Sequence, residues 1–309
     1  MNKEKHTIDT NEPFDHASMM KCLDIFADRY SIIGITSIGE SILGRTLPLI
    51  TVGEGKRAVL YVGAHHGMEW ITSALLIRFL NELCELFLKN GSAYGYSIAH
   101  ILKTRTLYII PMLNPDGVDY QINGVAEDNV LRERLIAMNG GSEDFSHWQA
   151  NARGVDLNRN YNSRFLEYKQ TEEKANTGGG APMKFAGVMP ESEPEVGALC
   201  NFLRFDEKIK AVLTFHSQGE EIYYTCGNGK ITPRSRSIGE RLSKLTGYKL
   251  ALPQKESAFC GLTDWCIDEL GLPSFTIECG KGENPLPIKN LFLIYMHLRE
   301  MLFTVPTII

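Results

Sequence analysis

The chain has 309 residues, which is enough to bury a substantial core, and length alone suggests about two domains. Apolar residues make up 43% and charged residues 22% of the chain, as in ordinary globular proteins. The formal net charge of −5 provides no basic surface field, so we expect no nucleic-acid partner.

The seven cysteines are scattered and never spaced as Cys-x-x-Cys, so neither a disulfide framework nor a zinc ribbon is expected. The scattered cysteines are explained more simply as reduced thiols of a cytoplasmic protein. The first ten residues, MNKEKHTIDT, contain no apolar segment of the kind found in signal peptides. No stretch approaches 18 uninterrupted apolar residues, so we expect no membrane span. These features together predict a cytoplasmic protein.

Strand-like and helix-like segments alternate in the first part of the chain. The periodicity predicts a helix over 18–29, strands over 44–52 and 58–63, a long helix over 70–89 and a buried strand over 106–112. Asn114-Pro115-Asp116-Gly117 is a strong turn signal after that strand. Residues 121–190 are polar and predicted to be irregular.

The alternation continues after this insertion. Ser192-Glu193-Pro194-Glu195 resembles a capping box that begins a helix ending near residue 204. Beyond it the pattern predicts a strand over 211–215, a helix over 233–246, a strand over 273–277 and a closing helix over 287–303. We therefore expect one α/β domain over 1–309 with a mixed, mostly parallel central sheet flanked by helices, its first ten or so residues loosely ordered.

A histidine and a glutamate three residues apart, His66 and Glu69, follow the apolar strand 58–63. A histidine with an acidic residue three positions later is expected about once by chance in this composition, and the chain has three such pairs. The pairs that begin at His6 and His297 lie in an N-terminal polar stretch and in a helix-like run, so we interpret both as structurally ordinary. His66 and Glu69 stand where a strand gives way to a helix, and there they can converge on one metal ion.

Four polar residues follow or end predicted strands: His66, Asn114, His216 and Glu278. Because the carboxyl ends of parallel strands line one crevice, these four side chains can meet. A catalytic zinc site needs three protein ligands and one open position, and His216 is the obvious third ligand beside His66 and Glu69. The sequence therefore predicts one zinc ion per chain.

Glu278 follows the apolar segment Phe275-Thr276-Ile277, and a carboxylate at a buried strand end needs a compensating partner or a function. A carboxylate near a metal can take a proton from water and pass it to a leaving amine, so we predict that Glu278 is a general base. The alternative is a salt bridge to an arginine of the insertion.

The insertion contains the polar loop 151–161. Its oxygen-bearing residues from Asp156 onward superficially trace a calcium loop, but Tyr161 occupies the sixth place, where that loop needs glycine. An arginine-bearing loop near a metal instead suggests recognition of a carboxylate, which guanidinium binds at two points.

Several motifs occur in the order seen in the zinc carboxypeptidase family, which this chain resembles over about residues 15–300. They are His66-Gly67-Met68-Glu69, Asn114-Pro115-Asp116-Gly117, Gly154-Val155-Asp156-Leu157-Asn158-Arg159-Asn160, Phe215-His216-Ser217, Asp264-Trp265 and Phe275-Thr276-Ile277-Glu278. The resemblance implies a single α/β domain, zinc ligands His66, Glu69 and His216, general base Glu278, and a substrate carboxylate held by Asn158 and Arg159. Carboxypeptidase A is a known example of this two-histidine, one-glutamate set.

The chain departs from the family at two positions. The arginine that polarises the scissile carbonyl in the family follows a tryptophan, whereas here Gln149 follows Trp148. Arg153, four residues on, is predicted to reach the same place, with Gln149 as the alternative. The family's clamping tyrosine falls at Glu256, which argues against ordinary removal of C-terminal amino acids from proteins.

The segment Gly280-Lys281-Gly282-Glu283-Asn284-Pro285-Leu286-Pro287 resembles a narrower branch, the bacterial γ-D-glutamyl-L-diamino-acid peptidases. This resemblance implies hydrolysis of the bond between D-glutamate and meso-diaminopimelate in murein tripeptides or tetrapeptides returned to the cytoplasm. Three alternatives stay open: a deacylase of N-acyl amino acids, a carboxypeptidase acting on polyglutamate tails or other peptides, and a non-catalytic binding module.

Overall fold

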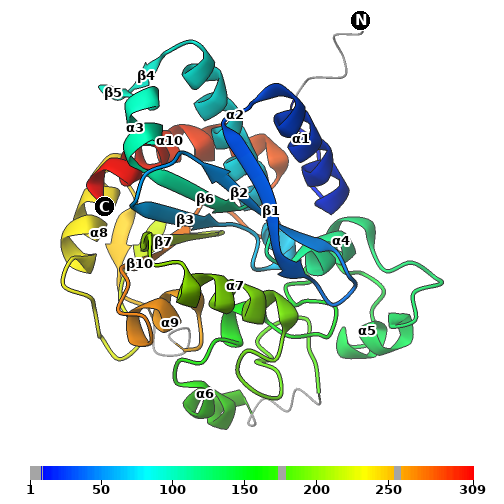
Figure 1. Ribbon diagram of the computed structural model, residues 1–309. Helices are drawn as coiled ribbons and strands as arrows, with labels where there is room; N and C mark the ends of the chain where they lie inside the picture. Colours follow the sequence, from blue (N-terminus) through cyan, green and yellow to red (C-terminus); the bar gives the residue numbers. More distant parts are fainter. Residues whose placement is uncertain (1–7, 9, 173–178, 254–258) are drawn as a thin grey trace, which may run out of the picture.

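The computed structural model describes residue 8 and residues 10–172, 179–253 and 259–309. Within these ranges the chain forms a central sheet of eight strands with helices on both faces (Figure 1). In sheet order the strands are β1 (Ile33–Glu40), β2 (Thr46–Val52), β6 (Thr106–Ile110), β3 (Ala58–Val62), β7 (Ile209–His216), β10 (Ser274–Glu278), β8 (Glu221–Tyr223) and β9 (Lys249–Ala251). This architecture confirms the predicted α/β fold.

The four central strands run in one direction. β3 pairs in parallel with both β6 and β7, and β7 pairs in parallel with β10. The pairings of β1 with β2, β2 with β6 and β10 with β8 are antiparallel, which makes the sheet mixed. The carboxyl ends of β6, β3, β7 and β10 therefore meet at one edge, as the sequence predicts.

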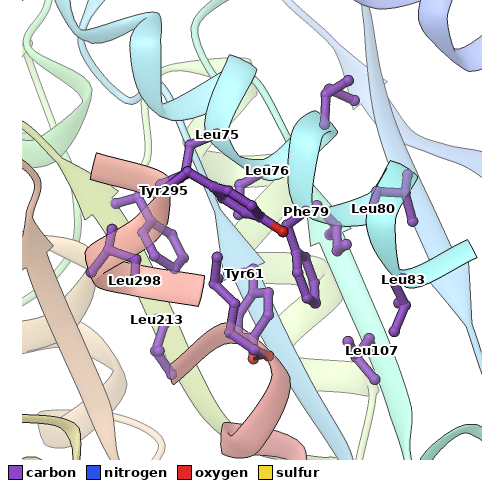
Figure 2. Close-up of a cluster of buried hydrophobic side chains, with 14 of the residues drawn as sticks. Tyr61, Leu75, Leu76, Phe79, Leu80, Leu83, Leu107, Leu213, Tyr295 and Leu298 are labelled. Carbon is purple, nitrogen blue, oxygen red and sulfur yellow. Dashed lines mark hydrogen bonds between the residues drawn. The ribbon is translucent and has the colours of Figure 1, made fainter. Parts of the chain in front are cut away.

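One face of the sheet is covered by helices that carry the largest apolar cluster. It includes Val59 and Tyr61 of β3, whose side chains point to the opposite face from Leu60 and Val62. Figure 2 shows Tyr61 packed between side chains of two long helices that lie across this face. The helices of this face are α1 (His16–Arg29), α2 (Ile71–Leu88), α3 (Ile98–Thr104), α8 (Ser235–Thr246) and α10 (Leu291–Ile308).

The other face packs against α7 (Pro194–Phe205) and α9 (Leu262–Asp268), through a second cluster that includes Leu60 and Val62. Both faces of the central strands are thus buried, which explains why their sequences are continuous apolar runs without alternation. The segment 288–308, which ends with α10, is long and apolar enough to cross a membrane by length and composition. However, 61% of its apolar window is buried against the protein, as in a core helix.

Three local predictions need correction. Asn114-Pro115-Asp116-Gly117 does not form an isolated turn: it begins α4 (Pro115–Asn123), with Asn114 as the N-cap and proline in the first turn, where its missing N–H costs nothing. The insertion 121–190 is less irregular than predicted, because it contains α5 (Arg132–Met138), the 3₁₀ turn η3 (Leu157–Arg159) and α6 (Phe165–Glu172). Its own small cluster around Trp148 supplies the packing that fixes it.

The predicted capping box before α7 does not form. The N-cap is Glu193 and makes no capping bond through its side chain. Ser192 instead donates to Glu193 Oε1 at 2.8 Å and accepts from Asn160, which belongs to the polar loop of the insertion. The prediction about the first ten residues concerns positions that lie mostly outside the described residues. The remaining elements are the short strands β4 (Ser92–Ala93) and β5 (Tyr96–Ser97) and the 3₁₀ turns η2 (Gly67–Glu69) and η5 (Ile288–Asn290).

Candidate metal centre and active site

A cavity of about 570 Å³ opens at the carboxyl ends of the central strands. This volume lies in the range typical of small-ligand sites. Six of the seven predicted site residues line it: His66, Glu69, Asn158, Arg159, His216 and Glu278. The tertiary structure therefore brings together side chains that are up to 212 positions apart in the numbering, from His66 to Glu278.

The three predicted metal ligands converge on one point. One donor atom from each of His66, Glu69 and His216 lies within 4.8 Å of the other two. Glu69 Oε1 is 2.8 Å from His66 Nδ1, and Glu69 Oε2 is 2.9 Å from His216 Nδ1. Two imidazoles and one carboxylate are the donor set of a catalytic zinc site that keeps a position open, and these residues border the cavity. The site therefore fits a zinc ion.

Two glycines permit the close approach of the segments that build this site. A Cβ on Gly67, between the first two ligands, would lie 2.4 Å from the Gly117 carbonyl oxygen. A Cβ on Gly117, in the first turn of α4, would lie 2.2 Å from the Ala150 carbonyl oxygen. Contacts this short are forbidden to any side chain, so α4 and the loop after Trp148 can lie against η2 only because both positions are glycine.

Charge is distributed unevenly around the ligands. Burial opposes protonation of His66, but Glu69 and Asp156 outweigh it and hold the His66 pKa well above its usual value. Burial also opposes ionisation of Glu69, yet His66 and His216 outweigh it and lower the Glu69 pKa to about 2. The site therefore keeps its carboxylate ligand ionised, as metal binding requires.

Asp156 is a site residue to which sequence reasoning assigned no role of its own. Its Oδ1 lies 3.2 Å from His66 Nε2, the ring nitrogen opposite the one that faces Glu69. Backbone N–H groups of Asn158 and Lys184 donate to its two carboxylate oxygens. Asp156 thus orients His66 from behind, a role that metal sites commonly give to a carboxylate. The signals in the sequence are its place in the polar loop and in the motif 154–160 shared with the zinc carboxypeptidase family.

Glu278 ends β10, and its Cα pairs with that of His216 across the parallel ladder. Burial, followed by the negative charge of Glu69, raises the pKa of Glu278 to about 8. Within the described residues Glu278 forms no ion pair, so the alternative of a salt bridge to an arginine of the insertion is not realised there. A carboxyl group with a raised pKa beside a metal site is suited to accept a proton.

Asn158 and Arg159 approach the cavity from η3. Asn158 Oδ1 accepts from the backbone N–H of Leu262, so its amide N–H groups are what it can offer a ligand. Arg159 Nη1 donates to the Phe259 carbonyl, and its guanidinium lies over the ring of Tyr168 at 5.2 Å. These contacts hold a guanidinium and an amide at the same wall of the cavity, which is suitable for binding an anion.

The two residues considered for polarising the scissile carbonyl, Gln149 and Arg153, lie in different positions relative to the cavity. Gln149 lines the cavity, whereas Arg153 is not among the lining residues. The Arg153 side chain is 51% exposed, and its nearest acidic partner is Glu193, with Nη1 3.8 Å from Oε2. Glu256, where the family's clamping tyrosine falls, lies outside the described residues.

Asn114, predicted to join the crevice, is structural. It is fully buried, and its amide nitrogen donates to the carbonyl oxygens of His65, Gln149 and Ala150 at 3.0, 3.0 and 3.2 Å. Its Oδ1 accepts from the Gly117 N–H at 2.9 Å. Asn114 therefore ties the end of β3, the loop that carries Gln149 and the start of α4 together behind the site.

The comparisons with known proteins agree with this geometry. A family model described as zinc carboxypeptidase matches residues 19–296. The γ-D-glutamyl-L-diamino acid endopeptidase 1 of Lysinibacillus sphaericus is 33% identical over 288 residues, covering 93% of this chain and 71% of that protein.

Solved structures show the same fold. Bovine thrombin-activatable fibrinolysis inhibitor, in complex with tick carboxypeptidase inhibitor, gives a TM-score of 0.72 at 21% identity over 96% of this chain and 97% of that one. The murein-tripeptide amidase of Escherichia coli O157 gives a TM-score of 0.53 at 21% identity, over 86% and 92% of the two chains. With a match that spans most of its length and a His-Glu-His site at the expected strand ends, the chain belongs to the zinc carboxypeptidase family and is a zinc metallopeptidase.

Proposed function

We propose that this enzyme hydrolyses the bond between γ-D-glutamate and meso-diaminopimelate in murein tripeptides or tetrapeptides. The observation that carries the proposal is the set of side chains that line one cavity. The set comprises the candidate metal ligands, Glu278, and the pair Asn158 and Arg159. The substrate class is supported by the likeness to the γ-D-glutamyl-L-diamino acid endopeptidase of Lysinibacillus sphaericus, at 33% identity over 93% of this chain. Hydrolysis of N-acyl amino acids or of an ordinary peptide C-terminus would use the same zinc-dependent chemistry, and a comparison of substrates distinguishes these alternatives.

Each group has a role in this proposal. Zinc held by His66, Glu69 and His216 supplies Lewis acidity, which polarises a carbonyl and acidifies water. Glu278 takes a proton from the attacking water at a carboxylate oxygen and returns it to the leaving amine of the diaminopimelate. Its raised pKa makes it a stronger base than an exposed glutamate.

Asn158 and Arg159 hold a carboxylate of the diaminopimelate, because an amide and a guanidinium supply several N–H donors to one anion. Gln149 takes the role first expected of Arg153, since it is the one of the two that lines the cavity. Its amide N–H is a suitable donor to the oxygen on which negative charge develops.

We further propose that the enzyme acts in the cytoplasm, on peptides that return from the wall. All seven cysteines are buried, and none forms a disulfide. Thiols in this number outside disulfides are typical of a reducing compartment.

The test uses the purified zinc enzyme and L-Ala-γ-D-Glu-meso-diaminopimelate, with release of free meso-diaminopimelate measured by chromatography. Glu278→Gln should lower kcat by about 10²–10⁴-fold, the usual contribution of a general base, while the zinc content stays at one ion per chain. Glu283→Gln is the matched control, because Glu283 also lines the cavity but is assigned no role in proton transfer.

Retained turnover in Glu278→Gln would remove Glu278 from the mechanism. Faster hydrolysis of N-acyl amino acids, polyglutamate tails or unmodified peptides than of the murein tripeptide would refute the substrate assignment. Absence of bound zinc together with absence of turnover on every substrate would favour a binding module.

A further inference from the structure

The two ligand histidines present the same ring atom to the common centre. Nδ1 of His66 and Nδ1 of His216 lie 3.3 Å apart, each within 2.9 Å of a different oxygen of Glu69. The Nε2 atom of each ring therefore remains for a second contact. In His66 that contact is the carboxylate of Asp156, already described, but in His216 it is not a carboxylate.

His216 Nε2 lies 3.3 Å from the hydroxyl oxygen of Thr214. The same hydroxyl is 3.2 Å from Nδ1 of His65, and His65 Nε2 is 2.9 Å from the hydroxyl of Tyr161. All four side chains are buried, with at most 2% of any residue exposed. Tyr161, His65, Thr214 and His216 thus form a continuous chain of hydrogen bonds without access to solvent.

The four residues of this hydrogen-bonded chain are positioned by the strands and turns that carry them. Thr214 and His216 are two residues apart on β7, so their side chains point to the same face of the sheet. His65 directly precedes the ligand His66, and its ring centroid is 5.2 Å from that of His216. Tyr161 follows η3 and packs on Trp265, with ring centroids 6.1 Å apart. The four members of the chain therefore come from three segments around the site: β7, the residues after β3 and the residues after η3.

A metal bound at His216 fixes the tautomer of that ring, and one arrangement of the other hydrogens follows the chain outward from it. The metal needs the lone pair of His216 Nδ1, so the hydrogen of that ring is on Nε2 and is donated to the Thr214 oxygen. The Thr214 hydroxyl hydrogen is then available to His65 Nδ1. His65 carries its own hydrogen on Nε2 and donates it to the Tyr161 oxygen. In this arrangement the donated hydrogens of His216, Thr214 and His65 each have an acceptor within the chain.

We propose that Thr214, His65 and Tyr161 are positioning residues that orient His216 and hold it in the tautomer that binds the metal. They do for His216 what Asp156 does for His66, but with neutral groups. A second orienting carboxylate would add negative charge next to Glu69, Asp156 and Glu278, and would weaken the Lewis acidity on which a catalytic zinc depends. A hydroxyl backed by a neutral imidazole gives the orientation without that charge.

The test measures the zinc dissociation constant by competition with a chromophoric chelator at fixed pH. Thr214→Val keeps the shape of the side chain and removes the hydroxyl, and it should weaken zinc binding by about 10–100-fold, the usual effect of losing such a partner. Thr214→Ser keeps the hydroxyl and should restore most of the affinity. The control is Thr304→Val, since the buried Thr304 hydroxyl has no hydrogen-bond partner in the described structure, and its zinc affinity should be unchanged.

Two further measurements test the proposal even if Thr214→Val fails to fold. Tyr161→Phe removes only the last acceptor of the chain and should weaken zinc binding less than Thr214→Val does. Imidazole ¹⁵N NMR of the zinc-loaded wild type should show the hydrogen of both His65 and His216 on Nε2. Wild-type affinity in Thr214→Val, equal losses in Thr214→Ser and Thr214→Val, or a hydrogen on Nδ1 of His65 would each overturn the proposal.

Discussion

Asn114 gives the sharpest test of how the site is supported. Its amide nitrogen donates to three carbonyl oxygens behind the cavity, and its Oδ1 caps α4. The two amide hydrogens satisfy buried carbonyls at about 1–1.5 kcal/mol each, and loss of an N-cap costs about 1 kcal/mol. Asn114→Ala should therefore lower the free energy of unfolding by about 3–4 kcal/mol.

The assay is urea denaturation of the metal-free protein, followed by circular dichroism. Asn123→Ala is the matched control, because Asn123 is exposed at the end of the same helix and its side chain makes solvent-exposed hydrogen bonds to the partly buried Asp15 and Asp119. It should cost less than about 0.5 kcal/mol.

Asn114→Asp separates the two functions of the side chain. It keeps an acceptor for the Gly117 N–H but turns an oxygen towards the carbonyls of His65, Gln149 and Ala150. We expect it to be at least as destabilising as Asn114→Ala. A loss below about 1 kcal/mol in Asn114→Ala, or wild-type stability in Asn114→Asp, would refute the view that Asn114 ties these segments together.

Three further predictions concern the site, the core and the response to pH. Gln149→Ala should lower kcat by about 10²–10³-fold, as loss of an oxyanion donor does. Arg153→Ala should have little effect on kcat, because the Arg153 side chain is half exposed and does not line the cavity. A larger loss of kcat in Arg153→Ala than in Gln149→Ala would reverse the assignment. Leu298→Ala removes a fully buried side chain between α10 and the sheet (Figure 2). It should lower the free energy of unfolding in urea by about 2–5 kcal/mol. Leu293→Ala, on the same helix and 62% exposed, should lower it little, and equal losses of stability in the two variants would contradict the packing. Burial raises the pKa of Glu195 from 4.5 to about 8, so the folded state keeps a proton that the unfolded state releases, and stability should fall as pH rises across that window by up to about 5 kcal/mol. Glu195→Gln should remove the Glu195 share of this slope in urea titrations of the metal-free protein between pH 5 and pH 8, while Glu278, whose pKa is raised to a similar value, keeps its own share. An unchanged slope would exclude Glu195 as a source.

The central strands could be predicted from the sequence alone, and so could the three residues that we propose as metal ligands. The segments 58–62, 106–110 and 211–215 are mostly apolar because both faces of these strands are buried, and this pattern is local enough to be recognised without coordinates. Once those strands are parallel neighbours, residues at their carboxyl ends must meet. His66, Glu69, His216 and Glu278 were therefore predictable as a group from strand ends and side-chain chemistry.

The surroundings of these four residues could not be predicted from the sequence and are seen in the folded chain. Whether Gln149 or Arg153 reaches the cavity depends on the path of a loop fixed by Asn114, by the packing of Trp148 and by the close contacts of two glycines. Asp156 contacts His66 across 90 residues, and Thr214 contacts His65 across 149 residues. Neither contact leaves a periodic signal in the sequence. Loops and orienting contacts depend on long-range packing, whereas strands and ligand types depend on local pattern and chemistry.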